Sequence, residues 1–395
     1  MSILPEARPG LQRPGPFLRL AMWWGPRPLL QAAAILLVVV LLAVLVSTVF
    51  ANMARVGISP GFGFLSRSAN FEIGEQPIAF RAGDTYLRAL AVGLLNTVKV
   101  ALLGCVLATV LGVAVGIAGL SGNPLLGGLV RGYVEVVRNT PLLLQLFFWI
   151  SLAQALPPPR RAFSLLDTAY LSNRGIFLPG PVLDGAGAGV WTAILSILAL
   201  LVAVLTAGRA RLGFRLRAML VVAAALAIAL VLKLGGVSVG FEAPALTGFN
   251  IRGGYSMTPE FAALLTGLVV KFSASIAEIV RAGILSVKQG QWEAGRALGL
   301  SNGQIMRLIV LPQALRVITP LTTSNYLDLT KDSSLAVAIG YPDLVNIVNT
   351  TANTTGQAFE ALTILVVVYL ILNIAVSILM NQYNTRVALR GGRPA

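Results

Sequence analysis

The sequence predicts an all-α, polytopic integral membrane protein with about eight transmembrane helices. Of its 395 residues, 56% are hydrophobic and only 11% are charged, which is far from the composition of soluble domains. Several uninterrupted apolar stretches reach the ~20 residues that a helix needs to cross a ~30 Å hydrocarbon core. The predicted spans are 29–51, 89–120, 130–156, 189–207, 218–236, 259–285, 313–337 and 359–380.

The N-terminal region predicts a tail followed by an uncleaved anchor. Residues 1–28 carry four arginines ahead of an apolar run that is too long for a signal-peptide core. We therefore expect a cytoplasmic tail at 1–28 and an extra transmembrane helix at 29–51. Arginine-rich connections face the cytoplasm, and with eight spans this rule places the tail at 386–395 and the connection at 286–312 inside, and the proline-rich loop at 157–159 outside.

Composition also argues against several classes of function. The net charge of +15 is scattered over the connections without an aromatic-basic array, so a nucleic-acid partner is not expected. The chain has no histidine and one cysteine, Cys105, inside an apolar run, which leaves no metal site. It contains no Gly-Lys pair for a phosphate-binding loop and no recognisable nucleophile-base pair. We expect a chain that is not an enzyme and holds no cofactor.

The connection at 286–312 contains the most distinctive motif. It reads EAGRALG from Glu293 to Gly299. Gly299 suits the left-handed position that ends a helix, and Ser301 and Gln304 have the spacing of a capping box that starts the next one. Two short helices are therefore predicted.

The second short helix carries an apolar face. Ile305, Leu308 and Ile309 recur at helical spacing, and Pro312, which lacks an amide hydrogen, closes this helix or opens the next. An apolar knob of this kind suits a groove in a soluble partner. An amphipathic element on the bilayer surface is the alternative, and the pattern alone does not decide between them.

This spacing resembles the EAA coupling signature of permeases of ATP-binding-cassette (ABC) importers. One departure is Gly295, where the signature usually has alanine; glycine weakens a helix by ~1 kcal/mol. The resemblance implies that the connection at 286–312 docks onto a separate cytoplasmic ATPase. The implied ATPase-coupling residues are Glu293, Ala294, Gly295, Gly299, Ile309, Leu311 and Pro312.

Further motifs resemble the polar amino acid uptake family, which includes histidine, glutamine and general L-amino acid permeases, and most of all its larger general L-amino acid type. The resemblance implies a type I importer core of five helices in a transmembrane domain at 89–385. The extra helix at 29–51 precedes this core, and two helices are inserted at 157–254. The motifs that carry the resemblance lie at 93–101, 138–142, 277–283 and 331–335.

The resemblance implies a permease subunit that translocates polar or general L-amino acids across a bacterial inner membrane. Its expected partners are an ABC ATPase dimer that uses the ATP, a second and related permease chain, a periplasmic amino-acid-binding protein, and membrane lipid. A heterodimer of permeases is favoured over a homodimer. The alternative function is a secondary transporter or channel for small polar solutes, which would need no docking knob.

Polar residues within the spans are the candidates for the substrate pathway, because charges in hydrocarbon are costly and face a cavity or a partner. The seventh span is polar over its second half, and Pro320 allows a bent or broken helix there. An amino acid needs an acceptor for its ammonium and a donor for its carboxylate. Alternatively, Lys331 and Asp332 neutralise each other. The candidates are Asn96, Lys99, Asn325, Asp328, Lys331 and Asp332.

Five other charged positions in the spans have structural explanations. Glu135 and Arg138 are three residues apart, as are Glu278 and Arg281, so each is expected to form an ion pair on one helix face. Lys271 is expected to reach the interface or to pair.

Overall fold

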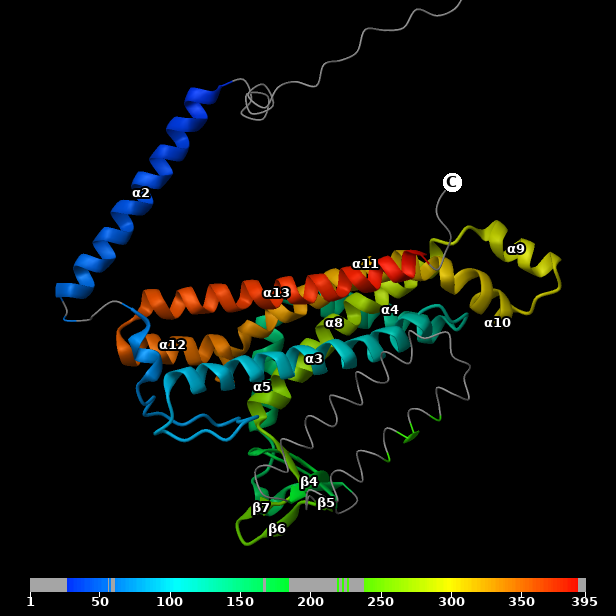
Figure 1. Ribbon diagram of the computed structural model, residues 1–395. Coiled ribbons are helices and arrows are strands. Elements are labelled where there is room, and N and C mark those ends of the chain that lie inside the picture. Colours follow the sequence, from blue (N-terminus) through cyan, green and yellow to red (C-terminus); the bar gives the residue numbers. More distant parts are fainter. Residues whose placement is uncertain are drawn as a thin grey trace, which may run out of the picture.

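The computed structural model describes residues 27–55, 57, 61–165, 168–184 and 238–389, with four isolated positions between 219 and 226. Long helices dominate these ranges, as predicted, and α9 and α10 lie at one end of the bundle (Figure 1). Five of the helices are long and apolar enough to cross a membrane, or six if one bent pair counts as a span. The predicted spans at 189–207 and 218–236 lie outside the continuously described residues.

The centre of the bundle is the pair α3 (Tyr86–Ala118) and α8 (Pro259–Leu285). Both helices start at a threonine cap, and Pro259 occupies the first turn of α8, where its missing amide hydrogen costs nothing. Their backbones touch at two glycines of α3. A Cβ atom on Gly112 would lie 2.9 Å from the Ser273 carbonyl oxygen, and one on Gly116 would lie 2.8 Å from that of Ala277. Larger residues at these positions would separate the two helices.

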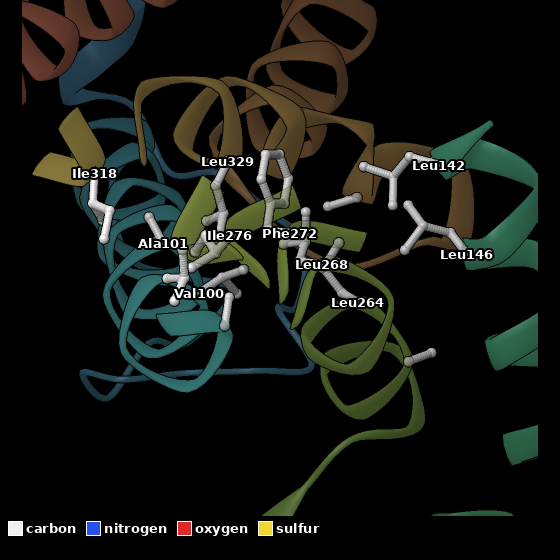
Figure 2. Close-up of a cluster of buried hydrophobic side chains, with 14 of the residues drawn as sticks. Val100, Ala101, Leu142, Leu146, Leu264, Leu268, Phe272, Ile276, Ile318 and Leu329 are labelled. Carbon is white, nitrogen blue, oxygen red and sulfur yellow. The ribbon is translucent and has the colours of Figure 1, made fainter. Parts of the chain in front are cut away.

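The hydrophobic core forms around α8, which lies between α3 and α5 (Leu142–Gln154) (Figure 2). Leu264 and Leu268 of α8 are fully buried, as is Leu146 of α5. Leu329 of α11 completes the cluster. Many other apolar side chains on the helices are exposed in the isolated chain, as lipid-facing residues must be.

The predicted span at 130–156 is two helices rather than one. The helix α4 (Pro124–Asn139) ends two residues before Pro141, and α5 follows at an angle of 105°. Proline has no amide hydrogen for the helical ladder and disfavours the helical conformation of the residue before it. The Thr140-Pro141 pair therefore breaks the expected span.

Of the bent or broken helix expected at Pro320, the broken form is wrong, because α11 (Leu311–Asp332) runs through that residue. The hydroxyls of Thr319, Thr322 and Thr323 each donate to the carbonyl four residues earlier. The hydroxyl groups of this stretch are therefore satisfied by carbonyls of the helix's own backbone. The last turn tightens into the 3₁₀ helix η4 (Ser333–Ile339).

The end of the bundle opposite α9 and α10, called the outer end below, contains elements that the sequence did not predict (Figure 1). The segment at 61–84, with the 3₁₀ helix η1 (Phe62–Ser66), packs with the short helix α12 (Leu344–Thr355) in a second hydrophobic cluster. Two predicted spans lie within the helices α2 (Pro28–Arg55) and α13 (Ala358–Leu389).

The inserted segment at 157–254 contributes short strands as well, which the sequence did not predict. A four-stranded antiparallel sheet has the order β1-β2-β3-β8, and two ribbons pair β4 with β5 and β6 with β7. Asp184 and Ser238 are paired residues in the β4–β5 ribbon, so the chain leaves this region and returns at neighbouring points. The strands, with η2 (Pro159–Arg161), are β1 (Phe163–Leu165), β2 (Ala169–Ser172), β3 (Gly175–Leu178), β4 (Gly180–Asp184), β5 (Ser238–Glu242), β6 (Ala245–Thr247), β7 (Asn250–Arg252) and β8 (Tyr255–Met257).

Candidate functional site

The segment at 286–312 folds as two short helices joined by a turn, as predicted (Figure 1). The first, α9 (Gln289–Ala297), ends at Gly299, whose φ of 74° is in the left-handed region. The second, α10 (Asn302–Ile305), begins with the predicted capping box: the Ser301 amide donates to Gln304 Oε1 at 2.8 Å, and the Gln304 amide donates to Ser301 Oγ at 3.4 Å. Local side-chain chemistry sets this turn.

Gly295 holds the two helices together. A Cβ atom on it would lie 2.8 Å from Ile305 Cγ1 and 3.2 Å from Ile309 Cδ1. The departure from alanine at this position therefore has a steric reason. Ile305 is fully buried and Ile309 is half-buried, so the expectation that Ile305, Leu308 and Ile309 form one docking face is wrong for the two isoleucines.

The outward face of the segment is made by other residues. Leu308 is 62% exposed and Leu298 is 78% exposed, and Glu293 and Ala294 of α9 are exposed as well. Sequence reasoning missed Leu298, although an apolar residue at a helix end directly before a left-handed glycine was visible in the motif. Leucine side chains that are exposed in this way are unfavourable in water, which indicates a surface that a partner covers.

A π-helix, η3 (Met306–Val310), connects α10 to α11, so the helix does not end before Pro312. The Leu311 amide donates to the Met306 carbonyl, five residues earlier. Pro312, exposed in the first turn of α11, cannot donate to the carbonyl four residues before it. The wider π turn ahead of the proline links the segment at 286–312 to α11 in one continuous helix.

Two of the proposed pathway residues, Asn96 and Lys99, are structural contacts at the outer end. Asn96 Nδ2 donates to the carbonyls of Glu75 and Pro342, both at 2.9 Å. Lys99 Nζ lies 2.6 Å from Glu75 Oε1 and 4.2 Å from the centre of the Phe261 ring. Sequence reasoning missed Glu75, because nothing local marks a loop carboxylate that reaches a helix 24 residues later.

A second acidic residue is buried nearby. Asp343 is 1% exposed and caps α12, where it accepts from the Asn346 amide at 2.9 Å. Burial raises the pKa of this carboxyl to about 7 because the charged form is poorly solvated. The outer end therefore contains a carboxyl that titrates near neutral pH.

The polar residues of α11 are not joined to this outer group by any hydrogen bond or ion pair between described residues. Asn325 Nδ2 donates to the Leu321 carbonyl at 3.1 Å. Asp328 and Lys331 are exposed, and Asp332 is half-buried. No ion pair joins Lys331 to Asp332, both of which the structure describes, so direct neutralisation within this pair is not seen. The exposed residues among them are therefore open to contact with any molecule that covers α11.

Lys271 stabilises the break between α4 and α5. Its ammonium donates to the carbonyl oxygens of Val137, Arg138 and Thr140 at 3.5, 2.9 and 3.3 Å. The buried amide of Gln145 donates to the first and last of these, at 3.0 and 3.1 Å. A cation at the carboxyl end of a helix also interacts favourably with the helix dipole. Two side chains thus satisfy the backbone that the break exposes.

One of the two expected ion pairs forms. Arg281 Nη2 lies 2.6 Å from Glu278 Oε1 on α8. No ion pair joins Glu135 to Arg138 on α4, although both are described, so that prediction is wrong.

Comparisons with known proteins agree on one family. The family model described as "Binding-protein-dependent transport system inner membrane component" matches residues 219–389. YhdX of Escherichia coli, named as an amino-acid ABC transporter permease protein, is 45% identical over 91% of this chain and 94% of its own length. The general L-amino acid transport system permease protein AapQ of Rhizobium johnstonii is 42% identical over 86% of each chain. BztB of Rhodobacter capsulatus, a glutamate/glutamine/aspartate/asparagine transport system permease protein, is 36% identical over 91% of this chain and 93% of its own length.

Proposed function

The chain belongs to the amino-acid ABC transporter permeases, which are inner-membrane transport components and not enzymes, and we propose that it moves polar L-amino acids through the membrane in response to ATP hydrolysis by a separate ATPase. The names of its relatives AapQ and BztB support amino acids as the cargo. No cofactor is needed in this chain, since the nucleotide is used by the ATPase.

The observation that carries this proposal is the outward face of the segment at 286–312. Leu298, Leu308 and Glu293 are all exposed on a segment that packs internally through Gly295 and Ile305. A helical element that presents apolar anchors in this way fits a groove on a soluble partner. The proposed coupling residues are Glu293, Ala294, Gly295, Gly299, Ile309, Leu311 and Pro312, with Gly295 and Ile309 acting from inside the segment.

The exposed polar residues of α11 support a second permease chain as partner. Asp328 and Lys331 lie on a membrane-spanning helix and are exposed in the single chain, which is unfavourable against lipid. A related but different permease subunit would cover them and enclose a pathway that includes Asn325 and Asp332. We further propose that an extracytoplasmic amino-acid-binding protein delivers the substrate, and that both termini face the cytoplasm.

The proposal is tested by copurification of the tagged full-length chain with an ATPase from membranes. Glu293→Lys reverses a charge on the outward face, so the variant is expected to retain at least about tenfold less ATPase, in line with the loss of a charge-assisted contact. Glu242→Lys is the matched control, because it makes the same chemical change on the exposed strand β5, in the inserted segment and outside the coupling segment.

Each outcome has a defined meaning. Retention of the ATPase by wild type and by Glu242→Lys, with loss from Glu293→Lys, supports coupling through this face. If the wild type carries no ATPase in mild detergent, the coupling proposal fails and a secondary transporter becomes the better explanation.

A further inference from the structure

A cavity of about 550 Å³ lies between α3, α4 and α8. It is close to the coupling segment, because Arg281 in its wall is four residues before the end of α8 and α9 begins at Gln289. Its size is within the ~300–1,000 Å³ of small-molecule sites. The lining residues are Gly116, Gly119, Val130, Arg131, Val134, Glu135, Arg138, Asn139, Ala277, Glu278 and Arg281.

The walls of the cavity are held in place by polar contacts between α4 and α8. Tyr133 Oη lies 2.7 Å from Ser273 Oγ and donates to the Val270 carbonyl at 3.1 Å. The Lys271 ammonium holds the carboxyl end of α4, and one of its acceptors is the Arg138 carbonyl itself. Contacts at the middle and at the carboxyl end of α4 therefore fix the helix face that lines the cavity.

That face presents three charged side chains in a row. Arg131, Glu135 and Arg138 follow each other at intervals of four and three residues, which places them on one side of a helix. None of the three forms an ion pair with another residue that the structure describes. Across the cavity Glu278 is already neutralised by Arg281 at 2.6 Å. The charged groups of the cavity wall that form no ion pair are thus two exposed guanidinium groups and one exposed carboxylate, and Arg138 also interacts electrostatically with Glu278.

The complement of these groups is a compact molecule with two anionic groups and one ammonium. Guanidinium binds carboxylate or phosphate oxygens in a bidentate geometry, and a carboxylate accepts from an ammonium. We propose that this cavity binds an amino acid with a side-chain carboxylate, such as L-glutamate, with its two carboxylates on Arg131 and Arg138 and its ammonium on Glu135. The inference rests on the proposed function and deepens it, because it names the charge class of substrate that this chain recognises itself.

The headgroup of phosphatidylserine presents the same chemistry, with a phosphate, a carboxylate and an ammonium. The experiment therefore uses the full-length chain in two kinds of nanodisc, one of phosphatidylcholine alone and one that also contains phosphatidylserine. Binding of radiolabelled L-glutamate is measured without a binding protein, so the signal reports on the permease. Native mass spectrometry of detergent-purified protein then measures retained phosphatidylserine.

In phosphatidylcholine discs we expect saturable glutamate binding that unlabelled L-glutamine displaces about tenfold less effectively, since glutamine lacks the second carboxylate. Arg131→Gln, Arg138→Gln and Glu135→Gln are each expected to weaken binding about tenfold or more, from loss of one charge-assisted contact. Arg252→Gln, on the exposed strand β7, is the matched control and leaves binding unchanged. Each variant must remain monodisperse and keep its ATPase, which separates loss of the site from loss of the fold.

The free amino acid and the lipid headgroup are expected to give different results. Glutamate binding that phosphatidylserine does not displace assigns the cavity to the free amino acid. Retained phosphatidylserine that Arg138→Gln releases, with no glutamate binding, assigns it to the lipid headgroup and overturns the amino-acid assignment.

Two results overturn the site altogether: binding of neither ligand by the wild type, or binding that all three variants leave intact. If the wild type binds neither but still carries the ATPase and supports uptake, only this inference fails. If it carries no ATPase, the proposed function fails as well.

Discussion

The two ends of the bundle are built on different principles. At the coupling end, the decisive contacts join residues close in sequence, such as Ser301 with Gln304. At the outer end they join residues far apart: Glu75 reaches Lys99, and Asn96 reaches the carbonyl of Pro342, 246 residues later. The coupling end leaves leucines exposed, whereas the outer end buries charge. One end leaves apolar side chains uncovered, and the other covers its charged side chains.

This difference predicts that the outer end responds most strongly to single substitutions. An ion pair with little exposure is costly to break, because one charge remains without a partner in a poorly solvated place. An exposed surface makes few contacts within the isolated chain, so substitutions there change the free energy of unfolding little. Substitutions at the two ends therefore test the comparison directly.

The largest effect is expected for Lys99→Met. It removes the partner of Glu75, which is 8% exposed, and the cation above the Phe261 ring. The free energy of unfolding is expected to fall by ~3–5 kcal/mol, measured by thermal or denaturant unfolding in detergent.

The double variant Glu75→Gln/Lys99→Met is the control, because it removes both charges together. It is expected to recover much of the loss, since the double variant buries no unpaired charge. If Lys99→Met is as stable as the wild type, the pair does not hold the outer end closed, and Lys99 returns as a candidate for the substrate pathway.

A smaller effect of pH is expected at Asp343. Its pKa of about 7 in the folded chain is above the ordinary value of 3.8, so the folded state binds the proton more tightly than the unfolded state. Stability from this group is full at low pH and falls as pH rises, by on the order of 2 kcal/mol between pH 5 and pH 7. Above about pH 8, where the carboxyl is almost fully ionised in both states, its contribution no longer changes.

Asp343→Asn isolates the pH-dependent contribution of this carboxyl to stability, because asparagine also caps helices but does not titrate. The unfolding midpoints of wild type and variant are compared at pH 5 and pH 8, and the gap between them is expected to shift in favour of the variant at the higher pH. An identical pH dependence in both proteins would mean that this carboxyl is solvated in the folded chain.

The same contrast explains what the sequence could predict. The helical membrane architecture, the left-handed Gly299 and the capping box follow from composition and from rules that act over a few residues. The break at Pro141 and the continuous helix through Pro320 have the same local residue type but opposite outcomes. Lys271 and Gln145 support the first and threonine hydroxyls accompany the second, and only the tertiary structure identifies the former pair.

The partners of Asn96 and Lys99 could not be predicted for the same reason, and the assignment of these two residues to the substrate pathway stays a prediction. A charged residue in a span indicates a partner, but the sequence does not identify that partner as Glu75 of an outer loop. Likewise, three-residue spacing fitted both Glu135–Arg138 and Glu278–Arg281, and only the second pair forms. Helical spacing makes a pair possible, while neighbouring helices decide whether it forms.

The smallest effect is expected at the coupling end, for Gly295→Ala. The substitution restores the usual residue of the EAA signature, which improves helix propensity by ~1 kcal/mol. Its methyl group, however, would lie 2.8 Å from Ile305 Cγ1, and overpacking costs ~1–3 kcal/mol. The net result is a loss of about 1 kcal/mol, together with a displaced second helix and weaker ATPase retention.

Gly303→Ala is the matched control, because a Cβ atom there meets nothing within 4 Å. The same helix-favouring change without the clash is expected to leave stability unchanged or slightly higher. Unfolding midpoints and ATPase copurification for the two variants then separate helix propensity from packing. If both alanines stabilise the chain equally, the two short helices move apart freely, and the docking face is shaped by the ATPase and not by Gly295.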